Sequence, residues 1–136
     1  MTTPPRLSIV LPAKNEAESL DALLKAITKR HPEAELIVVD DGSTDATAQV
    51  ATAAGARVIH HPYSMGNGAA IKSGARAARG EILVFMDADG QHDPEDIARL
   101  VARLDEGYDM VVGSRQAGSQ AKTPGHPLSL NARRRA

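Results

Sequence analysis

An acidic cluster follows an apolar run in the stretch FMDADGQHDPEDI, residues 85–97. Asp87 and Asp89 stand one residue apart directly after the apolar residues, and Gln91 follows two positions later. Carboxylate and amide oxygens are the ligands that hard cations such as Mg²⁺ and Mn²⁺ prefer, and a strand that breaks into a turn can direct both carboxylates to one side. The stretch is therefore a candidate metal site. A solvated turn that leads into a helix is the alternative, because Asp, Gly and Pro are ordinary turn residues.

Three other sites for metal or phosphate do not fit the spacing. Counted from Asp87, an EF-hand loop needs Gly in the sixth position and Glu in the twelfth, where this chain has His92 and Ala98. A Walker phosphate loop needs Gly directly before its Lys-Ser pair, and Ile71 occupies that place. A dinucleotide fingerprint needs G-x-G-x-x-G after the first strand, where residues 12–16 read PAKNE.

The elements that must position the acidic cluster follow a regular alternation. Short apolar runs predict strands at residues 7–11, 35–40, 56–61, 81–86 and 109–115. Segments of helical periodicity or high Ala content lie between them, and Leu20, Leu23, Leu24 and Ile27 form one apolar stripe. Strands that are apolar throughout and alternate with amphipathic helices indicate a parallel sheet covered on both faces. The fold expected is α/β and Rossmann-like.

The helix ends carry recognisable signals. Asn15 is expected either to cap the first helix or to act in the site, and Asp45 is expected to cap the second. Asp93, followed by Pro, caps the last helix. Gly55 and Gly107 stand where a helix C-terminus favours a positive φ, and Gly80 closes the Ala-rich helix.

Composition excludes several classes of protein. The 136 residues carry a net charge of −1, which gives no sign of a nucleic-acid-binding surface. The absence of Cys excludes thiol catalysis and fits a reducing cytoplasm. No apolar run reaches the roughly 20 residues that a membrane span requires. From Gly118 onward no period is sustained, so the segment is expected to be an irregular basic tail, with a frayed and solvated end at residues 133–135.

The polar loops are expected to converge. In an open parallel sheet, the ligand crevice lies beyond the carboxyl ends of the strands. The loops at residues 12–16, 40–45, 87–92 and 113–115 all sit on that edge. Their convergence favours the metal site over the solvated turn.

The stretches taken together resemble the family 2 glycosyltransferases of the GT-A fold, and especially the dolichyl-phosphate and polyprenyl-phosphate sugar synthases. The matching stretches cover roughly residues 7–115 and read IVLPAKNEAESL, ELIVVDDGSTDAT, GNGAAIKSG, FMDADGQHDPEDI and VVGSR. The resemblance implies a GT-A nucleotide-diphospho-sugar-binding domain at residues 1–117, with a mainly parallel sheet and helices on both faces. Residues 118–136 would be the irregular basic tail.

The resemblance also implies roles for particular residues. Asp87, Asp89 and Gln91 would hold Mg²⁺ or Mn²⁺ against the donor diphosphate, and Arg115 would reach that diphosphate or the acceptor phosphate. The catalytic set is thus Asp87, Asp89 and Arg115. The donor-binding set is Pro12, Asn15, Glu16, Asp41, Gly68, Asp87, Ala88 and Asp89. Lys14 stands where many relatives carry an aromatic residue.

The implied reaction is metal-dependent transfer of a sugar from a UDP- or GDP-sugar to an acceptor, foremost a polyprenyl phosphate. Members of this branch usually continue well past GSR, so a truncated or inactive nucleotide-sugar-binding module is an alternative. A transferase that acts on a small soluble hydroxyl acceptor is another, and Asp93 is a candidate base for it. The expected location is the cytoplasm or the cytoplasmic face of the membrane, without nucleic acid as a partner.

Overall fold

The structure of the protein is a computed structural model, which describes residues 4–90, 92–112 and 130–135. Strands and helices alternate along most of the described chain. Their bounds are β1 Leu7–Ala13, α1 Ala17–Arg30, β2 Glu35–Asp41, α2 Thr47–Ala53, β3 Arg57–His61, α3 Asn67–Ala77, β4 Ile82–Met86, α4 Glu95–Asp105, β5 Met110–Val112 and β6 Leu130–Arg134.

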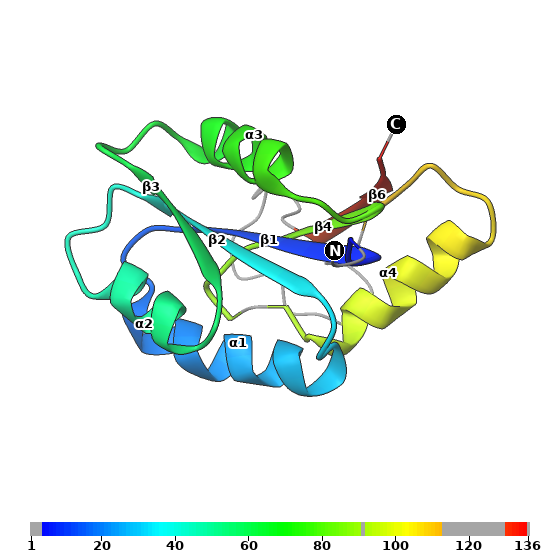
Figure 1. The fold of residues 1–136 in the computed structure, drawn as a ribbon, viewed down its shortest axis with the longest axis horizontal. Coiled ribbons are helices and arrows are strands. Elements are labelled where there is room, and N and C mark those ends of the chain that lie inside the picture. Colours follow the sequence, from blue (N-terminus) through cyan, green and yellow to red (C-terminus); the bar gives the residue numbers. More distant parts are fainter. Residues whose placement is uncertain (1–3, 91, 113–129, 136) are drawn as a thin grey trace, which may run out of the picture.

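The strands form one sheet in the order β3-β2-β1-β4-β6-β5 (Figure 1). β1 pairs in parallel with β2 and β4, and β2 pairs in parallel with β3. β6 lies between β4 and β5 and is antiparallel to both. The expected α/β fold with a mainly parallel sheet is confirmed, and β6 is its one antiparallel strand among the described residues.

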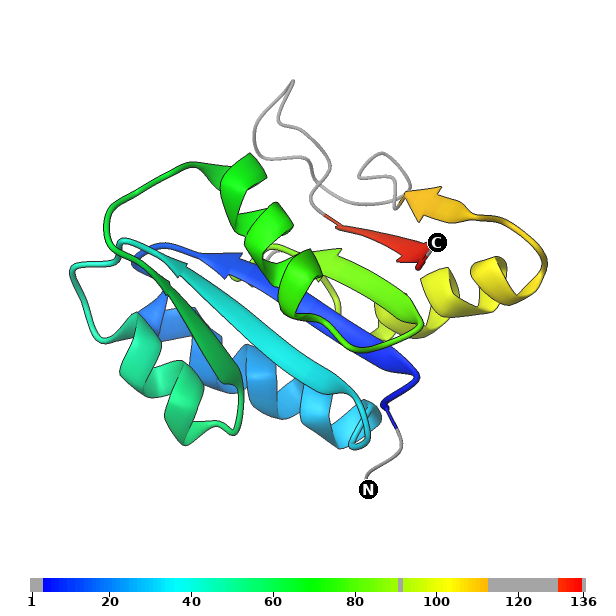
Figure 2. The same cartoon turned by 45° about the horizontal axis from the view of Figure 1, so that its top comes forward.

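Helices cover both faces of the sheet. α1, α2 and α4 lie on one face and α3 lies on the other (Figures 1 and 2). Neighbouring residues of β1 alternate between the two cores, since Ile9 and Leu11 pack on the α1 side and Val10 packs on the α3 side. This two-sided burial explains why the central strands are apolar throughout.

The helices follow the predicted stripes and most of the predicted ends. Leu20, Leu23, Leu24 and Ile27 are the buried residues of α1. Gly55 and Gly107 have φ values of +92° and +114°, as expected after α2 and α4. α3, however, ends at Ala77 and not at Gly80, whose N–H instead donates to Ser8 Oγ at 2.8 Å. Within the described residues, no helix has the length and apolar character needed to cross a membrane.

The prediction of an irregular tail at residues 118–136 is wrong for Leu130–Arg134, which forms β6. Leu130 and Ala132 are buried, while Arg133 between Ala132 and Arg134 is exposed. Two small or apolar residues are too few for a strand pattern, and pairing with β4 along five positions supplies what the local sequence lacks. Residues 118–129 and the expected boundary at 117 lie outside the described part of the chain.

The terminal arginines are not a frayed end. Arg134 forms an ion pair with Glu81 at 2.7 Å, and Arg135 Nε donates to the carbonyl of Gly80 at 3.0 Å. Both guanidinium groups therefore fasten β6 to the start of β4.

Candidate functional site

The loops that follow β1 and β2 are joined by hydrogen bonds. The N–H of Asn15 donates to Ser43 Oγ at 2.9 Å, and the N–H of Glu16 donates to Thr47 Oγ1 at 3.0 Å. In return, the N–H of Thr44 donates to Asn15 Oδ1 at 2.8 Å. The two loops therefore form one unit at the carboxyl edge of the sheet.

Asn15 does not cap α1, so the first of the two roles expected for it is wrong, and its role in the site stays a prediction. Its φ of +54° is left-handed, a conformation that Asn tolerates better than most residues. Its side chain is turned to Thr44 of the neighbouring loop, and the residue next to α1 is Glu16, which makes no side-chain capping bond. The conformation of Asn15 thus serves the junction between the loops.

Asp45 binds the beginnings of two helices. Its Oδ1 accepts hydrogen bonds from the N–H and hydroxyl of Thr47, the first residue of α2, and its Oδ2 accepts from the N–H of Ala17, the first residue of α1, at 3.2 Å. The hydrogen bond from the Thr47 hydroxyl lowers the pKa of Asp45, and the backbone donors add to the shift. The predicted capping role is confirmed and extends to a second helix.

Asp41 ends β2 and binds the loop before α3. Its Oδ1 accepts from the N–H of Met65 at 2.8 Å, and its Oδ2 accepts from the N–H of Gly66 at 3.0 Å. Burial alone would raise the pKa of Asp41, but hydrogen bonds from His61 and these two amides outweigh burial and lower it. Asp41 is therefore ionised at neutral pH, and its side chain, which accepts from His61, Met65 and Gly66, has capacity for a further donor.

The importance of His61 was missed in the sequence. Its ring Nδ1 lies 2.8 Å from Asp41 Oδ1 and its Nε2 lies 2.8 Å from Ser73 Oγ of α3. An ionised Asp41 only accepts, so Nδ1 of His61 donates to it while the other ring nitrogen contacts Ser73. His61 follows an apolar run with no partner nearby in sequence, so no local signal could have revealed it.

Glu16 lies in the electric field of the acidic cluster. Burial raises the pKa of Glu16, and the charges of Asp89, Asp87 and Asp45 raise it further, although a hydrogen bond from Ser19 opposes them. Like charges that raise a pKa in this way must be close to one another. The predicted convergence of the first, second and fourth strand ends is therefore present.

Ser19 fixes the acidic turn to α1. Its hydroxyl lies 2.9 Å from the carbonyl of Ala88, and 3.2 Å from Glu16 Oε2. Ala88 is buried between two half-buried aspartates. The Ser19 side chain of α1 thus holds the turn formed by Asp87, Ala88 and Asp89, called the D-x-D turn below, next to Glu16.

The carboxylates of the acidic turn suit a hard cation whose coordination shell is completed by a second molecule. Among the described residues, no group of three or more His, Asp or Glu side chains is placed to hold a metal ion. Two carboxylates are, however, what Mg²⁺ commonly uses when a substrate diphosphate completes its shell. The mutual repulsion seen in the pKa of Glu16 is what a cation would relieve. The chemistry of Asp87 and Asp89 therefore fits Mg²⁺ or Mn²⁺, while Gln91 and Arg115 lie outside the described residues.

The other predicted residues are placed as follows. Pro12 is buried in β1 opposite Val39 of β2. Gly68 is exposed in the first turn of α3, two residues after the Gly66 that Asp41 binds. Asp93 accepts from the N–H of Glu95, the first residue of α4, at 2.9 Å and so binds the start of this helix as predicted, although Pro94 precedes the helix and is not its first residue.

The position of Asp93 does not support its role as a base in this site. Glu95 forms an ion pair with Arg30 at 2.5 Å, and Arg30 is the last residue of α1. Glu16 lies at the other end of that helix, about 21 Å away along the axis at 1.5 Å per residue. α4 therefore starts beside the end of α1 that is remote from the acidic cluster.

Comparisons with known proteins agree on one family. The model of the family described as "Glycosyl transferase family 2" matches residues 8–135. An uncharacterized glycosyltransferase of Mycobacterium tuberculosis is 44% identical over 110 residues, which are 81% of this chain and 49% of that protein. An undecaprenyl-phosphate 4-deoxy-4-formamido-L-arabinose transferase of Pseudomonas fluorescens is 36% identical over 142 residues, covering 94% of this chain and 42% of that protein.

Solved structures agree with the sequence comparisons. Glucosyl-3-phosphoglycerate synthase from Mycobacterium tuberculosis, in complex with Mn²⁺ and UDP-glucose, superposes with a TM-score of 0.75 at 27% identity, covering 96% of this chain and 56% of that one. The same enzyme with phosphoglyceric acid gives a TM-score of 0.77 at 28% identity, covering 96% and 57%. This chain thus spans about half the length, or less, of the curated relatives it matches.

Proposed function

Because this chain belongs to glycosyltransferase family 2, we propose that it binds a UDP- or GDP-sugar with Mg²⁺ or Mn²⁺ and transfers the sugar to a polyprenyl phosphate. The observation that carries the proposal is the position of residues 87–89 beside Glu16, where the Ser19 hydroxyl lies 2.9 Å from the Ala88 carbonyl and 3.2 Å from Glu16 Oε2. Relatives named undecaprenyl-phosphate transferases, at 36% and 40% identity, support the lipid phosphate as acceptor. A location in the cytoplasm or at its membrane face remains a prediction.

The reaction would be a displacement at the anomeric carbon of the sugar. The bond from this carbon to the diphosphate oxygen breaks, a bond to the acceptor oxygen forms, and the nucleoside diphosphate leaves with the electron pair. A divalent cation, when bound, supplies Lewis-acid and electrostatic stabilisation of the leaving diphosphate. Asp87 and Asp89 would hold that cation, assisted by Gln91, and Arg115 would add positive charge. A phosphate acceptor is already ionised at neutral pH and needs no general base.

The remaining residues of the site would hold the nucleoside. Asn15 and Asp41 lie on the two joined loops, and Asp41 keeps acceptor capacity for a ribose hydroxyl or a base N–H. Pro12, Glu16, Gly68 and Ala88 complete the proposed donor pocket.

Two alternatives have support of their own. Similarity to glucosyl-3-phosphoglycerate synthase, in structures with phosphoglyceric acid, favours a small soluble hydroxyl acceptor. The coverage of about half of each relative favours a module that binds the donor without turnover. Donor binding is common to all three functions, so it is tested first.

Calorimetric titration of UDP-glucose and GDP-mannose, with and without Mn²⁺, tests donor binding. We expect metal-dependent binding that Asp89→Ala abolishes. Glu95→Ala is the matched control, because Glu95 lies in the same acidic stretch but pairs with Arg30, and this variant should bind like the parent. Binding by Asp89→Ala that is as strong and as metal-dependent as in the parent would contradict the metal site.

Acceptor choice is tested next with labelled donor. Transfer to a polyprenyl phosphate supports the proposed reaction, and transfer to 3-phosphoglycerate alone supports the soluble acceptor. Metal-dependent binding without any transfer supports the binding module.

A further inference from the structure

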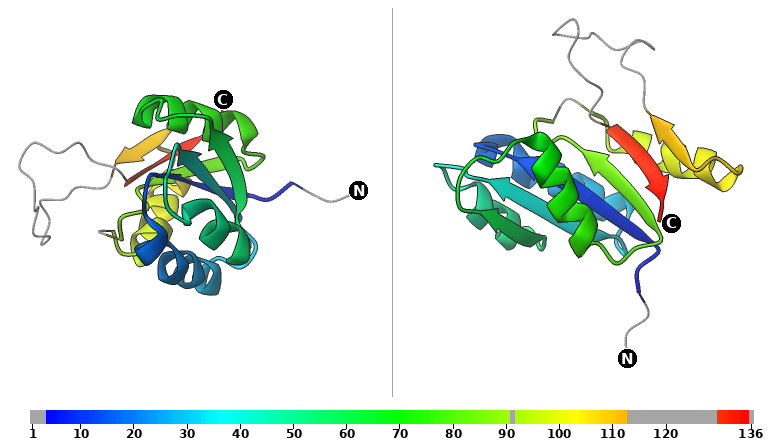
Figure 3. Two further views of the ribbon diagram at one scale, coloured as in Figure 1. Left: turned by 90° about the vertical axis from the view of Figure 1, so that its left-hand side faces the viewer. Right: turned by 90° about the horizontal axis from the view of Figure 1, so that it is seen from above.

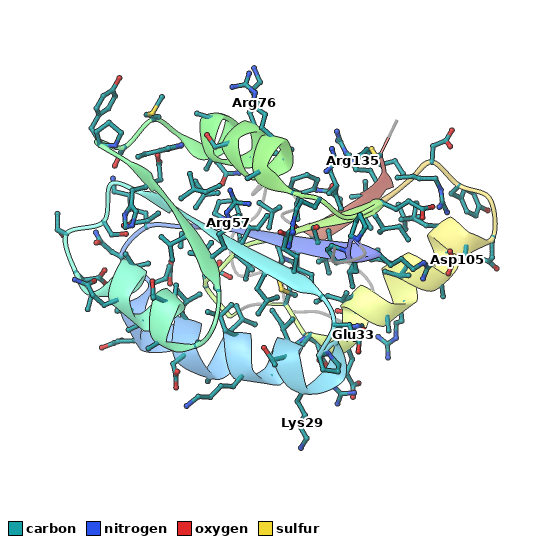
Figure 4. The ribbon with its side chains drawn as sticks, viewed as in Figure 1. Lys29, Glu33, Arg57, Arg76, Asp105 and Arg135 are labelled. Carbon is teal, nitrogen blue, oxygen red and sulfur yellow. The ribbon has the colours of Figure 1, made fainter. Side chains whose placement is uncertain are left out.

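The side of the sheet that carries α3 exposes cations with few carboxylates nearby. Residues 57–80, which include β3 and α3, contain no Asp or Glu. Lys72 and Arg76 lie one turn apart on the exposed side of α3, and neither forms an ion pair with a described carboxylate. Figure 4 shows Arg76 pointing away from the sheet on this side, while Lys29 points away on the other side.

The carboxylates of β2 and those beside β4 that reach this side are buried or paired with an arginine. Asp41 and Glu35 have side-chain exposures of only 11% and 7%, and they bind His61 and Arg79, respectively. Glu81, at the start of β4, pairs with Arg134. The positive charge of Lys72 and Arg76 is therefore left without compensation from this face.

Exposed apolar side chains occur near both edges of the sheet, in the loop before α3 and on β5. Tyr63 and Met65, in the loop before α3, are 65% and 47% exposed. Met110 and Val112 on β5 are 47% and 48% exposed. These are four of the five large apolar side chains that the described residues expose, the fifth being Tyr108.

The register places the β5 residues on the α3 side. Met110 is opposite Arg133 of β6, which is opposite Leu83 of β4, and Leu83 packs in the core beneath α3. Arg133 is exposed, so it adds a third cation beside Met110. Seen from above in Figure 3, α3 lies over the middle of the sheet, and no helix of the described chain lies over β5 and β6.

We propose that this α3 face, defined by Tyr63, Met65, Lys72, Arg76, Met110, Val112 and Arg133, binds the surface of an anionic lipid bilayer. Cations near an anionic bilayer are attracted to its headgroups, and aromatic and thioether side chains among them enter the interface. The opposite face has no comparable excess, because Lys25, Arg30 and Arg99 each pair with a carboxylate. The inference goes beyond the proposed reaction, since it concerns the face of the sheet that carries α3, which borders the proposed donor pocket only where Met65 binds Asp41.

Co-sedimentation with vesicles tests the proposal. The full chain is mixed with vesicles of phosphatidylcholine that contain either none or a third of phosphatidylglycerol, at low and at high salt. We expect binding to the anionic vesicles that high salt weakens. Lys72→Gln with Arg76→Gln should weaken it about 25-fold, as expected for two cations at about fivefold each. The matched control, Lys25→Gln with Lys29→Gln on α1, removes the same charge from the opposite face and should bind like the parent.

A third variant tests the apolar contribution. Tyr63→Ser with Met65→Ser keeps every charge and should still weaken binding several-fold. Failure of the parent to bind anionic vesicles would overturn the proposal, as would equal losses in the two charge variants. Binding to RNA without binding to vesicles, or dimerisation without vesicles that Lys72→Gln with Arg76→Gln disrupts, would assign the face to another partner. Mn²⁺-dependent donor binding, measured on the same proteins, reports separately on the proposed function.

Discussion

The pKa values of two carboxylates in the site, Glu16 and Asp41, are shifted in opposite directions. Burial and neighbouring negative charge raise the pKa of Glu16, whereas donors from His61, Met65 and Gly66 overcome burial and lower the pKa of Asp41. Asp41 is thus satisfied by the protein itself. A bound cation would favour the ionised form of Glu16, because it would offset the negative charges beside this residue.

We expect cation binding to lower the pKa of Glu16. A cation held by Asp87 and Asp89 would cancel the negative charges that contribute to the raised value. The side-chain carbon of Glu16 can be followed by NMR through a pH titration with UDP, with and without Mg²⁺. Asp89→Asn without metal should shift the pKa in the same direction. A pKa of Glu16 that does not change on adding Mg²⁺ would place the cation elsewhere.

Asp41 should contribute to acid sensitivity. Because its folded pKa is lowered, its stabilisation is complete above the ordinary pKa of an aspartate and is lost as the pH falls through the lowered value. Asp41→Asn should be less stable at neutral pH, since an amide cannot accept from all three donors. Its free energy of unfolding should also fall less steeply with acid, measured by urea unfolding from neutral to acidic pH. A parallel pH dependence in parent and variant would show that Asp41 makes no such contribution.

At the scale of elements, Gly42, the residue after β2, packs closely against the loop before α3. A Cβ at Gly42 would lie 2.6 Å from the N atom of Ser64, and its φ is +76°. Gly55, at the end of α2, has a φ of +92° but nothing within 4 Å of a Cβ. The two glycines therefore separate the cost of a positive φ from the cost of a clash.

Gly42→Ala should destabilise the protein more than Gly55→Ala. We expect about 1 kcal/mol for the positive φ at either site, and about 1–3 kcal/mol more at Gly42 for the contact with Ser64. Urea unfolding of both variants measures the difference. Equal losses would show that the loop before α3 moves aside without cost, and that Asp41 does not hold it firmly.

The elements that sequence predicted are those with their own pattern. β1, β2 and β4 are buried on both faces and so are continuous apolar runs, and α1 and α4 have clear stripes. β6 was missed because Leu130 and Ala132 alternate with polar residues over only five positions, and its pairing with β4 depends on residues about 48 positions earlier in the chain.

The candidate site could likewise be predicted from the sequence only where its residues have a local pattern. Asp87 and Asp89 could be found because they follow an apolar run, and their approach to Glu16 followed from the parallel order of strands. The bonds of Asn15 to Thr44, and of His61 to Asp41 and Ser73, join separate elements and have no local signature. Local signals also left a capping role open for Asn15, since a cap and a left-handed junction favour the same residue type.

At the scale of the whole molecule, β6 lies between β4 and β5 and joins them into one described sheet. Ala132 is fully buried against the α4 side, and the family match runs to residue 135, so the match includes this strand. Ala132→Asp should cost more than about 3 kcal/mol, because it buries an unpaired charge. The control Arg133→Gln alters the exposed neighbour and should change stability by less than about 0.5 kcal/mol. Thermal unfolding compares the two, and a small effect of Ala132→Asp would mean that β6 contributes little to the fold.

The position of β6 in the sheet also determines the order in which the strands can pair while the chain is being synthesised. β3, β2, β1 and β4 can pair as soon as they emerge, since each is complete before α4 is made. The free edge of β4 must then wait for β6, which is made after β5 and inserts between them. Until Leu130–Arg134 has left the exit tunnel, the nascent chain presents an unpaired apolar strand, Ile82–Met86, to any other strand nearby. Slow translation of the segment after Val112 would therefore lengthen the period in which the new chain is prone to aggregate.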